Sequence, residues 1–467
     1  MKHAVFLCPP FDSIVIRDNF CSKTSQAAYI NHPIDFVMQS GRFSEIGCTI
    51  HLIDAVVDRL SPEECIRRIA SVEPEIVYTL TGNASWDSDL QFFRTLRAAF
   101  PRMRLAAGGD VFLEDPVRML EQFDVFDALV MDYTIEGLTD YLSGRTPCRG
   151  MIYRNRGQIV DDRAPRPSGE SFEIPLPLHA LFSSKDYRYP FILKHPFATV
   201  MTEFGCPFHC AFCVMGTLGW RRRPIDNVMH ELQAVRALGI RDVFFIDQSF
   251  ASDRNRAMEL CGAIEQALPD MRWLGFSRVD LLDEELLLRM KRAGCHTLIL
   301  GVETASPELL ERYRKGYTLE QVRTIFSMLS RLRIRSVATF LLGLPGETWD
   351  SAVRTIEFAR DLACDFASIN IAAPRMGTDL RKWAVEAGLV PEGELRFDQS
   401  GSRIVMSSTA LSAEDLAHLK KLAVRRIYLR PRYVLKRLLA LRSIDEFRIQ
   451  SREALQLVIN HFRSLHH

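Results

Sequence analysis

The sequence predicts an α/β protein with two successive α/β units and a mainly helical C-terminal region. Short apolar runs alternate with amphipathic stretches over residues 1–145, and the alternation resumes near residue 197 and continues to about 380. At 467 residues the chain is also too long for one ordinary hydrophobic core. We therefore expect a domain at 1–145, a linker at 146–190, a second domain at 191–380 and a helical region at 381–467.

The first unit alternates five strand candidates with helical patterns. The strands are expected at 4–8, 49–53, 76–80, 104–107 and 128–131, and the helices at 34–46, 61–72, 87–99, 113–122 and 135–143. This order predicts an open, doubly wound (Rossmann-like) parallel sheet, which binds ligands at the carboxyl ends of its strands. The residues that we expect to approach a ligand there are Pro9, Thr79, Thr81, Gly82, Gly108 and Gly109. No GxGxxG follows the first strand, which disfavours a dinucleotide site, and ordinary strand-to-helix turns remain the alternative.

The linker has a composition of its own. Residues 154–158 (Arg-Asn-Arg-Gly-Gln) predict a turn between two short strands. Four prolines then predict an extended connector: Pro165, Pro167, Pro175 and Pro177.

The second unit predicts a partial (β/α)6 TIM-type barrel. Six strands are expected near 197–203, 242–247, 272–277, 296–301, 335–342 and 367–372. Helices are expected at 224–239, 252–267, 283–293, 306–332 with a break near Gly316, and 348–361. The active site of such a barrel lies at the carboxyl ends of its strands.

Three cysteines directly follow the first barrel strand. Cys206, Cys210 and Cys213 have the spacing CxxxCxxC. Four thiolates would close a zinc site or saturate a cubic iron–sulfur cluster, whereas three leave one iron of a [4Fe–4S] cluster open to another ligand. The alternatives are a zinc loop that uses His209 or a remote ligand, and buried cysteines that only pack.

The cysteine motif and the strand ends after it resemble the radical S-adenosylmethionine (SAM) superfamily, whose members bind SAM at the open iron. The resemblance implies that Asp247 lies near the amino group of SAM, that Arg278 pairs with its carboxylate and that Glu303 accepts hydrogen bonds from its ribose. Residues implied to bind SAM at these and the neighbouring positions also include Gln248, Ser277, Gly343 and Pro345. The sixth strand end, residues 373–378 (Ala-Pro-Arg-Met-Gly-Thr), is similar to the family's Pro-Gly-Thr with two inserted residues.

The order of the two units resembles the subfamily in which a cobalamin-binding domain precedes the barrel. The likeness lies in Pro9-Pro10, in residues 47–55 and in Gly108-Gly109, whereas the Asp-x-His-x-x-Gly motif that ligates cobalt in other cobalamin domains is absent. The resemblance implies an enzyme that generates a 5′-deoxyadenosyl radical and C-methylates an unactivated carbon. An enzyme that closes or contracts a ring with the same cofactors is the first alternative.

Two further alternatives concern the first unit. Methylthiotransferases also place an α/β domain before the barrel and bind a second cluster there through three cysteines. Cys8 and Cys48 occupy comparable positions, but a third cysteine is missing at the third strand, so we expect both to be packing residues. The other alternative is a non-catalytic redox module that binds cobalamin or a cluster.

Composition limits the partners. A net charge of +1 gives no reason to expect nucleic-acid binding, and no apolar run approaches the length of a membrane span. The eleven cysteines and an N-terminus without room for a signal peptide predict a reducing, cytoplasmic setting.

Two basic stretches allow an anionic or lipid-like small-molecule substrate. They are the triple Arg221-Arg222-Arg223 and the C-terminal residues Lys420, Lys421, Arg425, Arg426, Arg430, Arg432, Lys436, Arg437 and Arg442. The C-terminal set predicts a solvated helix pair that packs on the barrel, or contact with a membrane surface. The resemblance also implies an electron donor such as flavodoxin or ferredoxin.

Overall fold

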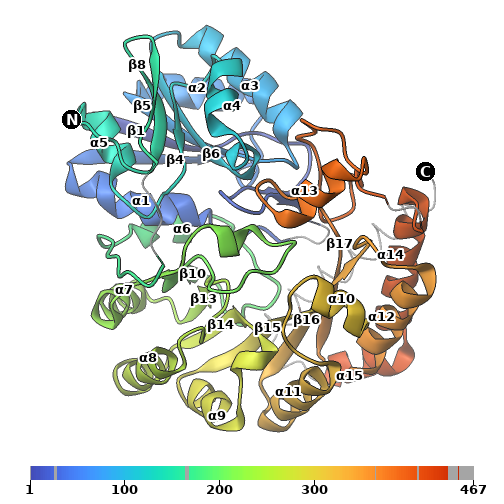
Figure 1. The fold of residues 1–467 in the computed structure, drawn as a ribbon. Helices are drawn as coiled ribbons and strands as arrows, with labels where there is room; N and C mark the ends of the chain where they lie inside the picture. Colours follow the sequence, from blue (N-terminus) through green and yellow to red (C-terminus); the bar gives the residue numbers. More distant parts are fainter. Residues whose placement is uncertain are drawn as a thin grey trace.

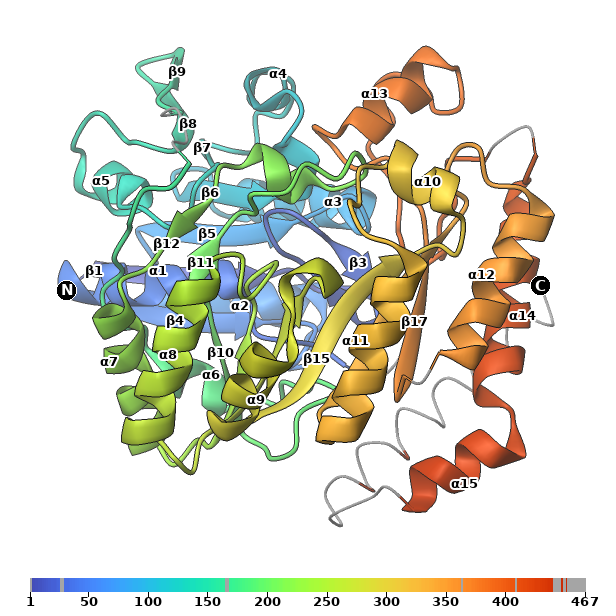
Figure 2. The same cartoon turned by 60° about the horizontal axis from the view of Figure 1, so that its bottom comes forward.

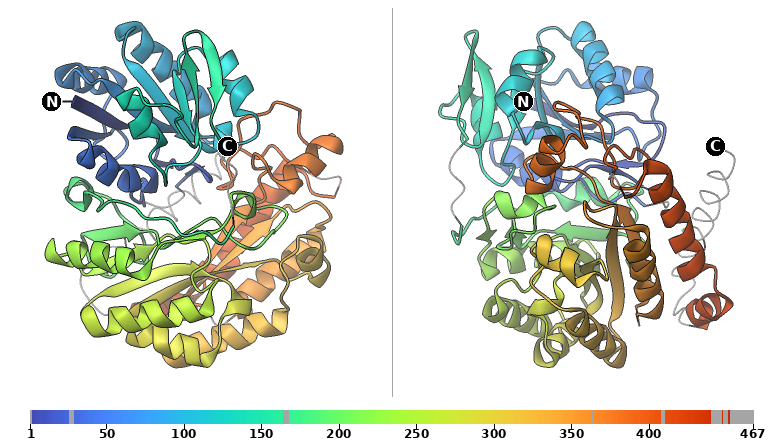
Figure 3. Two further views of the ribbon diagram at one scale, coloured as in Figure 1. Left: turned by 60° about the vertical axis from the view of Figure 1, so that its left-hand side comes forward. Right: turned by 45° about the vertical axis from the view of Figure 1, so that its right-hand side comes forward.

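The structure, a computed structural model, describes residues 2–25, 29–163, 168–362, 364–407 and 410–439, together with Phe447 and Ser451. Its N-terminal α/β unit lies over one end of a partial barrel, and the C-terminal helices run along one side (Figures 1 and 3). This confirms the predicted fold class.

The N-terminal sheet has the order β4-β1-β5-β6-β7-β8-β9. Its five parallel strands are those predicted: β1 (Lys2–Cys8), β4 (Cys48–Asp54), β5 (Ile76–Thr81), β6 (Arg104–Gly109) and β7 (Ala128–Val130). Helices cover both faces: α1 (Ile34–Glu45), α2 (Pro62–Val72), α3 (Trp86–Ala99), α4 (Pro116–Gln122) and α5 (Gly137–Ser143). Ser61 caps α2 by accepting from the amide of Glu64, as the Ser-Pro-Glu-Glu sequence predicts. The short strands β2 (Val15–Ile16) and β3 (Lys23–Thr24) form a hairpin in the segment after β1.

The predicted turn at 154–158 joins β8 (Met151–Asn155) to β9 (Gln158–Asp161). β8 pairs antiparallel with β7, so this part of the expected linker extends the N-terminal sheet. Arg156 and Gly157 both have positive φ, as a two-residue hairpin turn requires. Of the four connector prolines, Pro165 and Pro167 lie outside the described residues. The short helix α6 (His179–Ser183) follows the connector.

The barrel sheet contains six parallel strands in chain order. They are β10 (Phe197–Val200), β13 (Asp242–Phe245), β14 (Arg272–Ser277), β15 (Cys295–Glu303), β16 (Arg335–Leu342) and β17 (Phe366–Ile371). The outer layer of helices is seen in Figure 2: α7 (Ile225–Ala237), α8 (Arg254–Ala267), α9 (Glu284–Arg292), α11 (Leu319–Leu332) and α12 (Trp349–Asp361). The short helix α10 (Pro307–Arg312) precedes α11 and packs through Leu309 in a cluster with Ala211. The predicted break at Gly316, where φ is +73°, separates α10 from α11.

One hydrophobic core joins the two units. It contains Phe6, Phe36 and Tyr78 from the N-terminal unit together with Phe244 and Ile299 from inside the barrel. Each unit also has a hydrophobic core of its own, between its sheet and the helices that cover the sheet's other face. Because the shared core is continuous, the N-terminal sheet and the barrel are held in a fixed relation to each other.

Buried polar contacts also join the units. The guanidinium of Arg221, on the short strand β12 (Arg221–Arg222), donates to the carboxylate of Asp132 at 2.6 Å. The hydroxyl of Tyr187, in the connector that leads to the barrel, donates to Asp54 at 2.9 Å. These contacts hold the carboxyl edge of the first sheet against the barrel.

The C-terminal region is mainly helical, with α13 (Asp379–Glu386), α14 (Ala413–Tyr428) and α15 (Pro431–Leu439). α14 packs against α12 and β17, which agrees with the predicted packing on the barrel. Arg426 pairs with Glu357, and Arg437 lies 3.4 Å from Asp365. The side chains of Arg432 and Lys436, and all of Arg442, lie outside the described residues. None of the described helices is long and apolar enough to cross a membrane.

Candidate active site

The cysteine loop is closed at its base by a short antiparallel pair. Glu203 and Phe204 of β11 (Glu203–Phe204) pair with Arg222 and Arg221 of β12. Gly205, at φ +76°, starts the loop, and a Cβ there would lie 1.7 Å from the carbonyl oxygen of Gly219. Only glycine fits this crossing, so the residue before the first cysteine fixes the entry to the loop.

Backbone contacts hold the loop from outside. The amide of Ala211 donates to the carbonyl of Tyr313 at 3.2 Å, and the amide of Leu380 donates to the carbonyl of Ala211 at 2.9 Å. A Cβ on Gly216 would lie 2.2 Å from the carbonyl oxygen of Phe208. The loop is thus bound to the barrel on one side and to α13 on the other.

The three cysteines have free thiols. Burial raises the pKa of Cys206, and raises that of Cys213 to about 12. The guanidinium of Arg278 lies 3.4 Å from the sulfur of Cys210 and 3.8 Å from the centre of the Phe208 ring.

The donor set on the loop suits an iron–sulfur cluster. In a [4Fe–4S] cluster each thiolate binds a different iron. Three free thiols on one loop at a strand end, with a cation beside one of them, therefore fit a cluster with one open iron.

Asp247 lies at the predicted strand end, but its side chain turns toward the first strand. Its carboxylate accepts hydrogen bonds from the amide of Thr202 at 2.6 Å, the hydroxyl of Thr202 at 2.7 Å and the amide of Glu203 at 3.0 Å. The side chain is fully buried. We expected Asp247 to lie near SAM, whereas these bonds use it to fix the turn that leads into the cysteine loop.

Glu203 and Arg256 complete this base and were missed by sequence reasoning. Arg256 lies 3.2 Å from Glu203, and the indole of Trp220 donates to Glu203 at 3.0 Å. Burial raises the pKa of Glu203 to about 7, with Asp247 adding to the effect. The only sequence signal was an acid two residues before the Gly-Cys of the motif.

The other predicted SAM residues differ in whether they are exposed to a ligand or already hydrogen-bonded within the chain. Gln248 is exposed at the barrel mouth, whereas the hydroxyl of Ser277 donates to the carbonyl of Phe250 at 2.7 Å. The amide of Gly343 donates to Glu347 at 2.5 Å, and the carbonyl of Pro345 accepts from the Tyr313 hydroxyl at 2.8 Å. Gln248 is therefore open to a ligand, while the other three help to shape the loops.

Glu303 and Lys315 form a buried ion pair at the fourth strand end. The Lys315 ammonium lies 3.0 Å from a Glu303 oxygen, and both side chains are at most 10% exposed. Burial lowers the pKa of Lys315, but Glu303, Tyr317 and Cys210 together raise it by more. Lys315 was not predicted, because it lies in the break between two helices. Arg278 also donates to the Lys315 carbonyl at 2.5 Å and to Asp280 at 2.9 Å, so its charge is shared between these groups and the sulfur of Cys210.

The predicted cobalamin residues line the carboxyl edge of the first sheet, where the chain's own segment 17–22 covers part of them. A Cβ on Gly82 would lie 2.2 Å from the side chain of Ser22, and one on Gly108 would lie 2.8 Å from Asn19. The Thr81 hydroxyl donates to Asp89, which pairs with Arg17 at 2.6 Å. The other members bind nearby backbone: Thr79 donates to the carbonyl of Leu7, Pro9 accepts from Arg17, and Gly109 packs on the carbonyl of Thr81. These small residues therefore first make room for this segment.

Two buried polar atoms at the same edge have no hydrogen-bond partner among the described residues. They are the hydroxyl of Tyr78, which lies 3.1 Å from where a Cβ of Gly108 would be, and the side-chain oxygen of Asn83, next to Gly82. A ligand rich in amides could satisfy both. The edge thus keeps polar partners for a ligand beside the covering segment.

Cys8 and Cys48 lie at opposite ends of the first sheet. In the pairing of β1 with β4, Cys8 stands opposite Asp54 and Cys48 stands opposite Lys2. Six residues of strand separate them, or about 20 Å at 3.3 Å per residue. Both are buried, so they do not meet at one cluster and act as packing residues.

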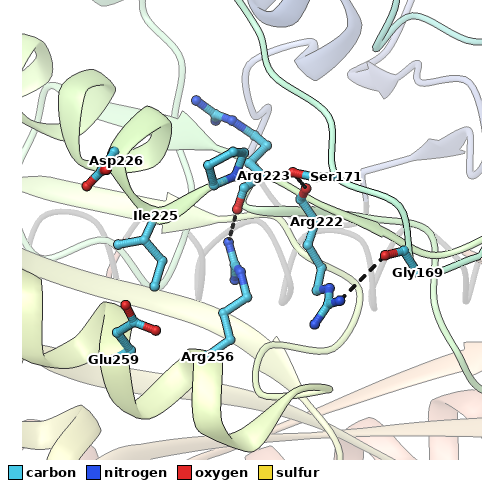
Figure 4. Close-up of a pocket in the computed structure, with 9 residues that line it drawn as sticks. Gly169, Ser171, Arg222, Arg223, Ile225, Asp226, Arg256 and Glu259 are labelled. Carbon is cyan, nitrogen blue, oxygen red and sulfur yellow. Dashed lines mark hydrogen bonds between the residues drawn. The ribbon is translucent and has the colours of Figure 1, made fainter.

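The arginine triple binds the chain's own acids. Arg221 pairs with Asp132, Arg222 with Asp253, and Arg223 with Glu231. A cavity of about 380 Å³ lies beside Arg222 and Arg223 and is also lined by Arg256 and Glu259 (Figure 4). Since each arginine already has a carboxylate partner, the triple stabilises the fold and does not offer a free site for an anion.

The chain is similar in sequence to a known superfamily and to two of its curated relatives. Residues 202–359 match the model of the radical SAM superfamily. An uncharacterized methyltransferase of Pyrococcus horikoshii is 29% identical over 399 residues, which are 83% of this chain and 86% of the relative. An anaerobic magnesium-protoporphyrin IX monomethyl ester cyclase of Rubrivivax gelatinosus is 31% identical over 353 residues, which are 70% of this chain and 61% of the cyclase.

A solved structure shares the whole fold. It is that of TsrM, a radical SAM methyltransferase from Kitasatospora setae, with cobalamin and a [4Fe–4S] cluster bound. The TM-score is 0.68 at 16% sequence identity, and the match covers 99% of this chain and 100% of the other. The similarity therefore extends over both α/β units and the C-terminal region.

Proposed function

Because residues 202–359 of this chain belong to the radical SAM superfamily, we propose that it is a cobalamin-dependent radical SAM enzyme that C-methylates a small molecule at an unactivated carbon. The observation that carries the proposal is the position of the cysteine loop. It follows the first barrel strand on the side where the carboxyl edge of the N-terminal sheet meets the barrel. A ligand at that edge and a cluster on the loop would face the same space.

Cys206, Cys210 and Cys213 would hold the [4Fe–4S] cluster, which when bound supplies the electron that cleaves SAM to methionine and a 5′-deoxyadenosyl radical. Arg278 and Lys315 place positive charge beside the cluster loop, and Glu303 offers a carboxylate to ribose hydroxyls. Asp247 would act as a positioning residue for the loop, because its carboxylate accepts hydrogen bonds from Thr202 and Glu203.

Cobalamin would lie along the carboxyl edge of the first sheet and when bound supplies the methyl group. Tyr78 and Asn83 would offer it buried polar atoms that have no partner among the described residues. The Pyrococcus horikoshii relative named as a methyltransferase and the similar fold of TsrM support methyl transfer. An electron donor such as flavodoxin or ferredoxin would deliver the reducing electron. Contact of the C-terminal helices with a membrane surface would suit a lipid-like substrate.

Ring closure is the second candidate function. It is favoured by the 31% identity to the anaerobic cyclase, although this chain spans only 61% of that protein. Both reactions would use the same cofactors, so the site residues do not separate them.

The products separate the two candidates. The anaerobically reconstituted, reduced protein is loaded with cobalamin and incubated with SAM and extracts of its source cells. Methylation consumes two SAM molecules and yields S-adenosylhomocysteine together with 5′-deoxyadenosine. If 5′-deoxyadenosine forms alone, ring closure replaces methylation. If the protein cleaves SAM but retains no cobalamin, the proposed methyl donor is wrong.

A further inference from the structure

Arg375 lies where the two proposed cofactor regions meet. It follows β17 in the loop 372–378, and its guanidinium reaches across to Asp110, which directly follows Gly109 at the edge of the N-terminal sheet. Its backbone is fixed, because the Arg375 carbonyl accepts from the Thr378 hydroxyl at 2.7 Å and its amide donates to the carbonyl of Ala373 at 2.9 Å. The side chain is therefore held in this interface from its own loop.

The guanidinium is buried but only partly bonded. Its side chain is 10% exposed, Nη1 is 3.5 Å from the nearer Asp110 oxygen, and Nη2 has no partner among the described residues. Asp110 already accepts from the amide and hydroxyl of Ser22 and from the amide of Asn83 at 2.7–3.0 Å. A buried donor without an acceptor is costly, which points to a group that is bound there in the working enzyme.

The charged groups around Arg375 indicate which kind of ligand its guanidinium would bind. Burial lowers the pKa of Arg375, but Cys21, Asp110, Asp18 and Cys213 raise it by more, so these groups lie close by. Lys23 adds a second cation, and burial raises the pKa of Asp110 to about 6. A guanidinium donor forms its strongest bonds with carboxylate or phosphate oxygens.

We propose that Arg375 binds an anionic group, a carboxylate or phosphate, of the substrate. This rests on the proposed function, because the site lies between the cluster loop and the cobalamin edge, where a substrate must reach both. The substrate class is then a small molecule with at least one acidic oxygen group. The SAM carboxylate and the cobalamin phosphate carry the same chemistry and are the other sources to be distinguished.

The test uses the full chain with cluster, SAM and cobalamin loaded, and inorganic pyrophosphate and succinate as probes. Calorimetric titration compares the wild type with R375Q, R375K and R381Q. Arg381 is a control, because it is also buried at the interface but has a close carboxylate partner, Glu114, at 2.5 Å. We expect one of the probes to bind the wild type and R381Q alike, R375Q to bind it at least tenfold more weakly, and R375K to lie between them.

The same samples identify the source of the anion. SAM affinity, measured by equilibrium dialysis, and retained cobalamin, measured by absorbance, should be unchanged in R375Q. A tenfold loss of SAM affinity, or loss of cobalamin, would assign Arg375 to a cofactor and overturn the proposal. Equal probe binding in the wild type and R375Q, or no saturable binding of either probe to the wild type, would also overturn it. Substrate-free SAM cleavage by the wild type tests the proposed function separately, so the two failures are distinguishable.

Discussion

Glu347 provides a sharp test of the loop that follows the fifth barrel strand. Its side chain is fully buried, one oxygen accepts from the Gly343 amide at 2.5 Å, and the other has no partner among the described residues. Burial raises its pKa from 4.5 to about 7, although the Gly343 hydrogen bond opposes this. The folded chain thus holds a proton there that the unfolded chain has lost above pH 4.5.

The sign and size of the effect follow from proton linkage. Between about pH 4.5 and 7 the folded state binds more protons, so the free energy of unfolding falls as pH rises. A tenfold change in proton affinity is worth about 1.4 kcal/mol, which gives a loss of about 3 kcal/mol across this window. The contribution is complete below pH 4.5 and has gone above pH 7.

The substitution Glu347→Gln replaces the protonated acid with a neutral amide. Thermal unfolding at pH 5 and pH 8 should show the variant gaining about 3 kcal/mol relative to the wild type as pH rises. For a chain of 467 residues that unfolds as one unit, this is a shift of about 3 °C in Tm. Glu386→Gln, at an exposed position, sets the baseline. If the difference between E347Q and the wild type is the same at both pH values, the burial argument is wrong.

Three further predictions follow from the site and its supports. Gly205→Ala should reduce bound iron from about four to less than one per chain after reconstitution, because its Cβ meets the Gly219 carbonyl; Gly239→Ala, with a similar φ and open space, should keep its iron. Arg221→Met should lower the free energy of unfolding in urea by about 3–5 kcal/mol, because it leaves the buried carboxylate of Asp132 without its cation. Recovery of stability in the double variant R221M/D132L would confirm the pairing. A urea midpoint of R221M equal to that of the wild type would contradict it. Glu303→Gln should weaken SAM binding about tenfold in equilibrium dialysis, which is the value of a hydrogen bond to a charged group. Glu308→Gln, on the exposed side of α10, should leave SAM binding unchanged. Equal losses of SAM affinity in the two variants would show that Glu303 does not contact SAM.

The sequence predicted the strands of both sheets because each is a short apolar run between helical patterns with clear caps. It also placed the cysteine loop, since a motif directly after a strand has little freedom of position. The hairpin of β8 and β9 was foreseen as a hairpin, but its pairing with β7 depends on tertiary contacts that a local pattern does not carry.

The positions of site residues at strand ends were predictable, whereas the residues that their side chains contact were less so. Position along a strand located Asp247, but the direction of its side chain depends on Thr202, which lies 45 residues earlier. Lys315 and Arg375 come from loops without periodicity, and their roles appear only when the fold brings Glu303 and Asp110 beside them. The arginine triple had the opposite outcome, because its carboxylate partners lie on other elements and neutralise a charge that looked free in the sequence.

The most direct test of the central claim is the formation of 5′-deoxyadenosine from SAM by the anaerobically reconstituted and reduced protein. The wild type and Cys48→Ala should both bind about four irons per chain and form the product, since Cys48 only packs in the first sheet. Cys210→Ala, which removes the thiol beside Arg278, should form none. Product formation by Cys210→Ala at the wild-type rate, or none from a wild type that carries its full iron, would contradict the account.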